Sequence, residues 1–395
     1  MKKIVLLCIA VLAAAGVYAQ ELTDAQRAVL EAAQAYTEAD QVDKKPDKKP
    51  TNWTSNLKTQ INIGQTSLTN WAAGGDNTVS LQGFVDGNAN WKLNEMFWNN
   101  RLQLDYGFLY ASSKPILQKS TDRIYLESKW GYKTEKMKNL YFSANYDFKS
   151  QFTTGYDYKT PSVPTADPSG NPYPDGTELD NLDRDILKQL WKDARVNKSG
   201  FLAPAYTNLA LGIDYKPFNW LSINFAPLTG GYVIVRNKEY RKAYSMNLKP
   251  VWKDYDALSD EQKKEFDDAM ASKDDALIGS FYQGARFEFG AQLKMDAGFS
   301  INDNFKYTTQ VVLFYNYLAG QNEVGGKCPR INWDNRIDWK LAKYFSFTIT
   351  TNLIYDDTIM ILNDNDLDAF PEGKARVQFK ESLAFGFTWT IANKK

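Results

Sequence analysis

The sequence predicts an all-β protein: a transmembrane antiparallel β-barrel of about 12 strands, with two long extracellular loops that carry short helices. Three observations lead to this prediction. Long segments alternate between apolar and polar side chains, short connections alternate with long ones, and Trp and Tyr gather near one set of segment ends. In outer-membrane barrels each strand has one face toward lipid and one toward a polar lumen, so these three features occur together.

The segment Trp98–Ala111 shows the alternation most clearly. One face carries Trp, Leu, Tyr and Phe side chains, and the other carries Arg101, Gln103 and Asp105. Successive side chains of an extended strand leave opposite faces, so this pattern predicts a strand. The segment is longer than the roughly 9–11 residues that a strand needs to cross a bilayer.

The composition narrows the choice of protein class. The 395 residues include 47 basic and 47 acidic side chains, no histidine, and 14% aromatic residues. Loss of the two lysines in the predicted signal peptide leaves 45 basic and 47 acidic residues, a net charge near −2. Nucleic-acid-binding proteins carry a basic surplus, so no nucleic acid partner is expected. No stretch reaches 18 apolar residues, so no membrane-spanning helix is expected.

The N-terminal region is predicted to lie outside the barrel. Residues 1–19 are predicted to be a signal peptide, because two lysines precede an apolar run that ends at Val17-Tyr18-Ala19. Residues 20–50 are predicted to be a periplasmic helix and a charged, proline-broken linker. That segment has three interpretations: a solvated tail, a plug inside the lumen, or a helix that docks a partner. Residues 51–395 form the predicted outer-membrane barrel.

Twelve strands are expected in chain order. In the first, Trp53 shares a face with Leu57 and Ile61. An even number of strands returns both ends of the barrel to the same side of the membrane. The strands are expected near 53–63, 79–93, 98–111, 124–133, 140–151, 209–215, 221–225, 287–297, 305–317, 331–341, 345–355 and 377–391.

The connections between these strands differ in length on the two sides. Short turns are expected near 94–97, 134–139, 217–220, 300–304 and 342–344. Long loops are expected near 64–78, 112–122, 153–204, 236–280, 319–330 and 357–374. Outer-membrane barrels keep short turns in the periplasm and long loops outside the cell.

Two features complete the expected strand and loop pattern. Helices are expected in two long loops, at about Glu178–Arg195 and after Ser259, where Gln262 completes a capping box. An aromatic girdle at the periplasmic rim is expected from Trp91, Trp98, Tyr132, Tyr215, Trp220, Trp339 and Trp389.

Charged side chains on the lumen faces are mixed in sign. A selective channel clusters one sign at a constriction, so the mixture favours a water-filled or salt-bridged interior. The predicted lumen charges are Arg101, Asp105, Arg123, Glu127, Lys129, Asp147, Lys149, Asp214, Lys216, Arg286, Glu288, Lys294, Lys306, Asp334, Arg336, Asp338 and Lys340.

Two residues do not fit the alternation. Glu381 has the parity of lipid-facing neighbours, which places it at the outer rim or on a bulge that turns it inward. Pro227 lies inside a strand pattern, where it cannot donate a ladder hydrogen bond. A bulge at the outer rim is the favoured interpretation of Pro227, and a lateral opening for an apolar ligand is the alternative.

No catalytic, cofactor-binding or metal-binding residue is assigned. Barrel hydrolases use a histidine base, which this chain lacks, so no enzymatic activity is expected. The acidic stretch Asn363–Asp368 resembles a calcium loop, but Ala369 and Ala375 replace the glycine and glutamate of an EF-hand. A weak cation site shared with lipopolysaccharide and a solvated loop both remain open. Gly74-Gly75 lacks the lysine and helix of a phosphate loop and predicts a tight turn.

Several motifs resemble an uncharacterised outer-membrane β-barrel family of Bacteroidetes, catalogued as a domain of unknown function. They are Asn70–Gly75, Phe148–Phe152 with Gly155-Tyr156, Phe201–Tyr206, Gly212–Pro217 and Lys380-Glu381. The resemblance spans most of residues 53–391. It implies a location and an architecture, and it implies no catalytic residue or cofactor.

The sequence therefore favours a barrel in the outer membrane of a Gram-negative cell, surrounded by the lipid bilayer and lipopolysaccharide. Twelve strands enclose a lumen wider than the eight-strand limit that side chains alone can fill. A passive or weakly selective pore for small solutes is the favoured function. The alternative is a non-conducting structural or assembly subunit that docks an envelope protein through residues 20–50 and the extracellular loops. Cys328 is expected in an extracellular loop.

Overall fold

The structure is a computed structural model in which residues 51–66, 78–135, 137–318, 328–342, 344–361, 369 and 374–393 are described. The chain divides into two units, Met1–Thr51 and Asn52–Lys395. The predictions for residues 1–50, for Gly74-Gly75 and for Asn363–Asp368 fall outside the described residues. No helix of the described part of the chain is long and apolar enough to cross a membrane.

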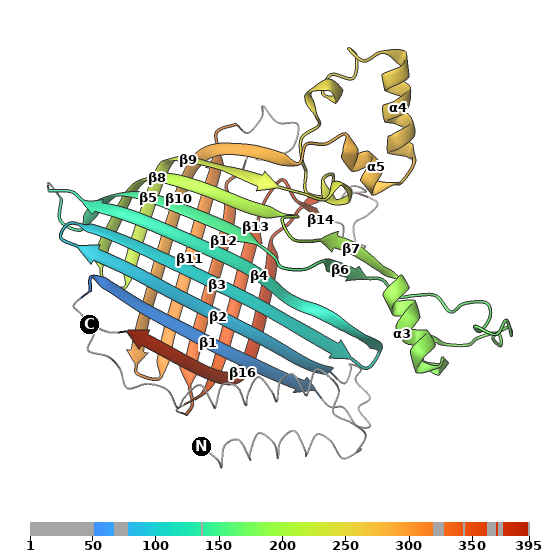
Figure 1. The fold of residues 1–395 in the computed structure, drawn as a ribbon, viewed down its shortest axis with the longest axis horizontal. Helices are drawn as coiled ribbons and strands as arrows, with labels where there is room; N and C mark the ends of the chain where they lie inside the picture. Colours follow the sequence, from blue (N-terminus) through green and yellow to red (C-terminus); the bar gives the residue numbers. More distant parts are fainter. Residues whose placement is uncertain are drawn as a thin grey trace. The chain divides into compact units, whose positions relative to one another are not determined.

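Twelve antiparallel strands close into a barrel, which confirms the predicted fold class (Figure 1). In their order around the wall they are β1 (Trp53–Thr66), β16 (Gln378–Asn393), β13 (Phe345–Tyr355), β12 (Arg330–Lys340), β11 (Phe305–Asn316), β10 (Ala285–Asn302), β9 (Leu221–Ile234), β8 (Ala205–Phe218), β5 (Leu140–Ser150), β4 (Lys114–Lys133), β3 (Met96–Ala111) and β2 (Thr78–Leu93). β1 pairs with β16 on one side and with β2 on the other, so no strand edge stays open.

The two faces of the barrel wall differ as the sequence predicts. Large apolar side chains project outward and stay exposed, including Leu57, Leu102, Leu126, Leu293 and Phe385. Polar side chains of the opposite parity point into the lumen, where many of them are buried. An apolar exterior around a polar interior is the arrangement of a transmembrane barrel.

Aromatic side chains gather at one rim of the barrel. The Trp53 and Trp98 ring centroids lie 5.7 Å apart, and Phe218 stacks on Trp220 at 5.1 Å. Tyr132, Tyr215 and Trp339 of the predicted girdle are also exposed. We call this rim the short-turn end. The Trp389 side chain lies outside the described part of the structure.

Short turns join the strands at this aromatic rim. At the opposite end of the barrel, which we call the long-loop end, most connections are long. One prediction about these connections was wrong. Residues 112–122 are not a loop, because β4 begins at Lys114 and pairs there with β3, beyond the point where its pairing with β5 ends. This extension is stabilised by packing of Ile116 against Leu187 and Trp191. The apolar–polar alternation is absent in this extension because its side chains pack against other parts of the protein and face neither lipid nor the lumen.

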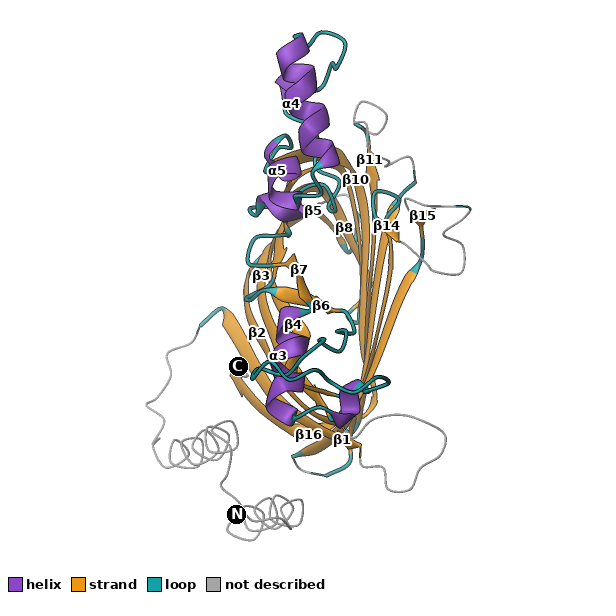
Figure 2. Ribbon diagram, turned by 90° about the vertical axis from the view of Figure 1, so that its right-hand side faces the viewer, coloured by secondary structure: helices purple, strands orange, loops and turns teal. Residues whose placement is uncertain are grey.

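Two long excursions at the long-loop end carry the expected helices (Figure 2). The first contains β6 (Gly155–Tyr158), η2 (Leu179–Asn181), α3 (Arg184–Asp193) and β7 (Arg195–Ser199). The second contains η3 (Lys238–Tyr240), η4 (Pro250–Trp252), α4 (Asp260–Ala271) and α5 (Asp275–Ser280). A further short pair joins β14 (Met360–Ile361) to β15 (Lys374–Ala375).

The helix boundaries follow their capping residues. α3 is shorter than predicted, because Asp183 caps it by accepting a hydrogen bond from the Asp185 backbone N–H. The capping box predicted at the start of α4 is present, with Ser259 and Gln262 bonded reciprocally.

Pro227 lies on a β-bulge, as the favoured interpretation predicted. The register with both β8 and β10 shifts at this point, and pairing resumes on either side, so the wall has no lateral opening there. Thr229 Oγ1 spans the bulge by donating to the Ala226 carbonyl at 3.1 Å. The predicted position at the outer rim was wrong, because Pro227 lies in the middle of β9. A proline is tolerated there because the bulge removes the need for its N–H.

Glu381 is exposed on the outer face, four residues into β16 from the long-loop end. The pairing of β16 with β13 has no register shift at this point, so no bulge turns the side chain inward. The rim interpretation therefore holds, since a charge near the interface costs only about 0–1 kcal/mol.

Closure of β8 on β9 depends on Gly212. A Cβ atom at this position would lie 2.1 Å from the Phe225 carbonyl oxygen, whereas one at Gly83 would lie 4.0 Å from its nearest neighbour. We expect Gly212→Ala to destabilise the barrel by about 1–3 kcal/mol, as overpacking does. The measurement is the temperature at which the compact band of unboiled protein disappears in detergent gels. Gly83→Ala is the matched control, and equal melting of the two variants would contradict this assignment.

Candidate functional site: the lumen

The barrel encloses a polar cavity of about 1210 Å³. It reaches Lys92 and Lys216 near the short-turn end, and Lys149 and Lys380 toward the long-loop end. The cavity therefore follows most of the length of the wall. Its width is set by side chains that meet across the interior.

A first cross-lumen contact joins β4 to β10. The Lys294 ammonium donates to Glu127 Oε1, and the Tyr125 hydroxyl donates to Glu127 Oε2 at 3.0 Å. β5, β8 and β9 separate these two strands along the wall, so the pair spans the interior as a chord. Lys294 is 3% exposed. We call this contact the first chord.

Polar side chains fill the space behind the first chord. Asp214 is fully buried and accepts hydrogen bonds from Lys129 at 2.7 Å and from Ser222 at 2.7 Å. Asn224 donates to the Ser143 hydroxyl at 2.7 Å. Asp214 and Asn224 each have at least one partner, but Asn224 Oδ1 and both polar atoms of the buried Asn145 side chain have no hydrogen bond among the described residues.

A second cross-lumen contact joins β1 to β12. The Asp338 carboxylate binds the Lys58 ammonium at 2.9 Å and the Arg336 guanidinium at 2.9 Å. Arg336 also donates to Gln60 Oε1 at 2.6 Å, and its guanidinium lies 4.6 Å from the Phe84 ring centroid. We call this contact the second chord. It fills the interior beside β13 and β16, where Thr348 is buried.

The open cavity lies between the two chords, and its lining carries nine Lys and Arg side chains against six Asp and Glu. Arg101 binds Asp86 at 2.8 Å, and Gln310 donates to Asp296 at 2.6 Å. We call the ion pairs of the two chords and their charged neighbours the waist. Its charges are paired, four cations with four anions: Lys58, Arg101, Lys294 and Arg336, with Asp86, Glu127, Asp296 and Asp338. The small basic surplus in the cavity lining favours anions weakly.

The second excursion, residues 235–284, covers part of the long-loop end. The Arg286 guanidinium on β10 donates to the Ser245 carbonyl, and the Ser245 hydroxyl donates to the Thr358 carbonyl at 2.7 Å. Arg330 adds paired hydrogen bonds to Glu288 beside these contacts. These contacts hold the excursion against β10 and the chain that follows β13.

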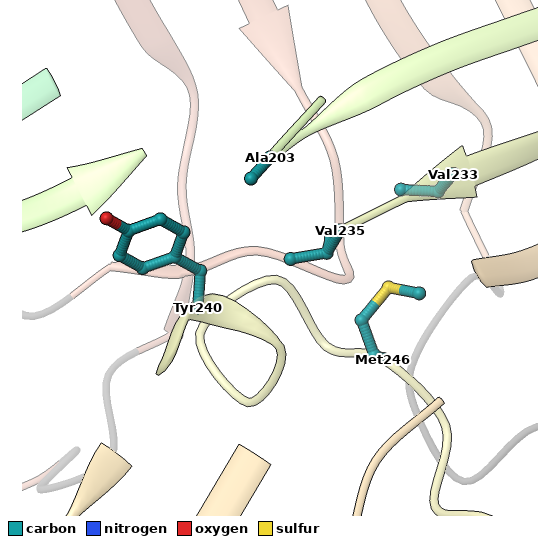
Figure 3. Packing of buried hydrophobic residues seen from close by; sticks show 5 residues of the cluster. All are labelled: Ala203, Val233, Val235, Tyr240 and Met246. Carbon is teal, nitrogen blue, oxygen red and sulfur yellow. The ribbon is translucent and has the colours of Figure 1, made fainter. Parts of the chain in front are cut away.

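A small apolar core stabilises the same arrangement (Figure 3). Ala203, Val233, Val235, Tyr240 and Met246 are buried together, and Tyr244 packs against them. Burial raises the pKa of the Tyr244 hydroxyl to about 12, so this group stays neutral at physiological pH. The excursion is therefore folded against one side of the long-loop end, and we refer to residues 235–284 as the lid.

The structure brings together most of the lumen charges predicted from the sequence. Glu127, Lys129, Asp214, Arg286 and Lys294 are buried in ion pairs or hydrogen bonds, whereas Lys306 and Lys340 are exposed near the short-turn end. The prediction missed several participants: Lys58, Gln60, Asp296, Arg330 and Asp356. The alternation of these residues with apolar neighbours in the sequence is the pattern that could have predicted their position in the lumen.

No metal centre is evident in the described residues, where no three Cys, Asp or Glu side chains lie close enough to hold an ion. Cys328 is exposed beside the start of β12, and its backbone N–H donates to Asp357 at 2.9 Å.

Comparison with known proteins gives a partial family match. Residues 63–156 match a family described as a protein of unknown function (DUF3078), which agrees with the resemblance to an uncharacterised family. No curated protein matches the chain.

Solved structures with a similar chain path are distant. An outer membrane channel from Pseudomonas putida F1 gives a TM-score of 0.33 at 8% identity, over 88% of this chain and 100% of that one. The translocator domain of the autotransporter NalP from Neisseria meningitidis gives 0.31 at 9% identity, over 92% and 95%. Outer membrane phospholipase A from Escherichia coli gives 0.28 at 8% identity, over 88% and 93%. At these values the matches assign no activity to this chain.

The first chord yields a test of the lumen packing. Glu127→Gln leaves the buried Lys294 ammonium without its carboxylate, and removal of one partner of a buried pair costs about 3–5 kcal/mol. We expect the urea midpoint of unfolding to fall accordingly. The matched control is Glu95→Gln, whose pair with Lys133 is exposed and worth about 0–1 kcal/mol. Similar midpoints for both variants would show that the first chord contributes no stability.

Proposed function

We propose that this protein is an outer-membrane β-barrel that provides a passive, weakly selective path for small polar solutes. The observation that carries the proposal is the polar cavity of about 1210 Å³ that follows the wall between the two chords. Its lining is mixed in sign with a small basic surplus, which favours a weak selectivity for anions. The chords narrow the path, so only small solutes would pass.

The exterior of the barrel supports the proposed location. An apolar outer face suits lipid, and the aromatic rim suits a membrane interface. The proposed orientation places the short-turn end in the periplasm and the long-loop end outside, next to lipopolysaccharide. The proposal includes no enzymatic step, because the chain has no histidine to serve as a general base near neutral pH.

Planar bilayers test the pore directly. We expect purified protein to produce discrete conductance steps, with a small reversal potential in a KCl gradient whose sign reflects a weak preference for chloride, because the lining has a small basic surplus. A variant lacking residues 20–50 should give larger steps if that segment occupies the lumen, and unchanged steps if it does not. Absence of any current from both forms would rule out the pore.

The lid supports a second candidate function, a docking or assembly subunit. Its outer part has a separate aromatic core, in which the Trp252 and Phe281 ring centroids lie 4.7 Å apart and Phe266 packs against both. A pore does not require such an aromatic core. This part of the lid also leaves the Val251 and Tyr255 side chains exposed. A partner that co-purifies only when the lid and residues 20–50 are intact, together with electrical silence, would favour this alternative.

Cys328 provides a test of orientation. We expect a membrane-impermeant maleimide to label it on intact cells, because the thiol is exposed at the long-loop end. A Cys328→Ser variant is the control for labelling of other proteins. Labelling that requires rupture of the outer membrane would invert the proposed orientation.

A further inference from the structure

Two cations in the cavity, Arg123 and Lys149, differ from those of the waist. Both line the cavity in its half toward the long-loop end. Within the described part of the chain, neither has a carboxylate within 4.0 Å or a hydrogen-bond acceptor, whereas each waist cation is paired. Two such cations in the same half of the cavity require an explanation.

The strand register places these two side chains together. Tyr125 on β4 is directly opposite Lys149 on β5, and Arg123 has the same parity two residues further along. Arg123 and Lys149 are therefore diagonal neighbours on the lumen face, with Cβ atoms about 7–8 Å apart or less. One small anion between them could contact both heads.

The nearby carboxylates are held by neutral donors instead of by these cations. Asp105 accepts from Gln82 at 2.8 Å and from Thr121 at 3.2 Å. Asp147 accepts from Asn208 at 3.0 Å. Because amides and a hydroxyl occupy these carboxylates, the guanidinium and the ammonium remain free to bind a solute.

The Arg123 guanidinium also lies against an aromatic ring. It lies 5.1 Å from the Tyr125 ring centroid, and its Nε atom is buried without a hydrogen-bond partner among the described residues. Buried donors nearly always have an acceptor, from protein, water or ligand. The planar fork of a guanidinium fits the paired oxygens of a carboxylate or phosphate.

We propose that Arg123 and Lys149 form a binding site for the oxyanion group, carboxylate or phosphate, of a small solute inside the lumen. The inference builds on the proposed pore and names the class of solute that it would favour. Arg123 supplies the paired hydrogen bonds and Lys149 a second positive charge. Asp105 and Asp147 flank the site, so a solute with a single oxyanion group fits better than a polyanion.

The test measures binding without requiring transport. Full-length protein in a phosphate-free detergent is added to inorganic phosphate, and the ³¹P line width of phosphate is recorded. We expect broadening that acetate reverses, since a single carboxylate competes for the same donors. In the double variant Arg123→Gln/Lys149→Gln the broadening should fall at least fivefold. Arg123→Lys keeps the charge but loses the fork, and should lose part of the broadening.

Matched controls separate this site from general charge effects. Lys306→Gln removes another unpaired cation of the same parity near the short-turn end, and should leave the broadening unchanged. Heat-modifiable gel migration confirms that each variant is folded. Absence of broadening in the natural protein, or equal broadening in the double variant, would overturn the site. Bilayer current without ³¹P broadening would contradict the binding site and support the pore. Broadening without current would support the binding site and contradict the pore.

Discussion

The closed ring of backbone hydrogen bonds is the constraint on which the rest of the structure depends. The hydrocarbon core of a bilayer offers no water to an unpaired N–H or C=O group, so a strand can cross it only inside a complete ladder. Pairing of β1 with β16 completes that ladder. Closure forces alternate side chains outward and inward, which explains the apolar exterior and the polar lumen. It also explains why Gly212 lies where two backbones approach closely.

Closure with twelve strands creates an interior too wide for single side chains to fill. The protein fills part of it with paired charges that meet across the interior. The Glu127–Lys294 and Lys58–Asp338 contacts divide the cross-section into packed margins and an open centre. Charge pairing therefore both stabilises the wall and sets the width of the path. Arg123 remains outside this pairing, which connects the architecture to a specific solute chemistry.

Alternation in the sequence was sufficient to predict the strand number, the short turns and the parity of most lumen charges. It could not show which charges meet, because the chord pairs depend on strand tilt and stagger, which no local pattern encodes. Lys149 and Lys294 look alike in the sequence, yet only Lys294 is paired. The start of β4 was missed because Ile116 packs against α3, outside the alternation imposed by lipid and lumen. The lid likewise lacks periodicity, and its position follows from contacts such as Ser245 with Thr358.

The most direct test of this account is a spin-label accessibility scan along β11 in a Cys328→Ser background, with the protein in lipid vesicles. Labels at Thr308 and Gln310 face the cavity and should collide mainly with a polar nickel chelate. Labels at Val311 and Leu313 face outward and should collide mainly with oxygen dissolved in lipid. The account predicts two opposite accessibility profiles with a period of two residues. Equal access of the chelate to both faces would contradict a transmembrane barrel, and exclusion of the chelate from both would contradict a water-filled lumen.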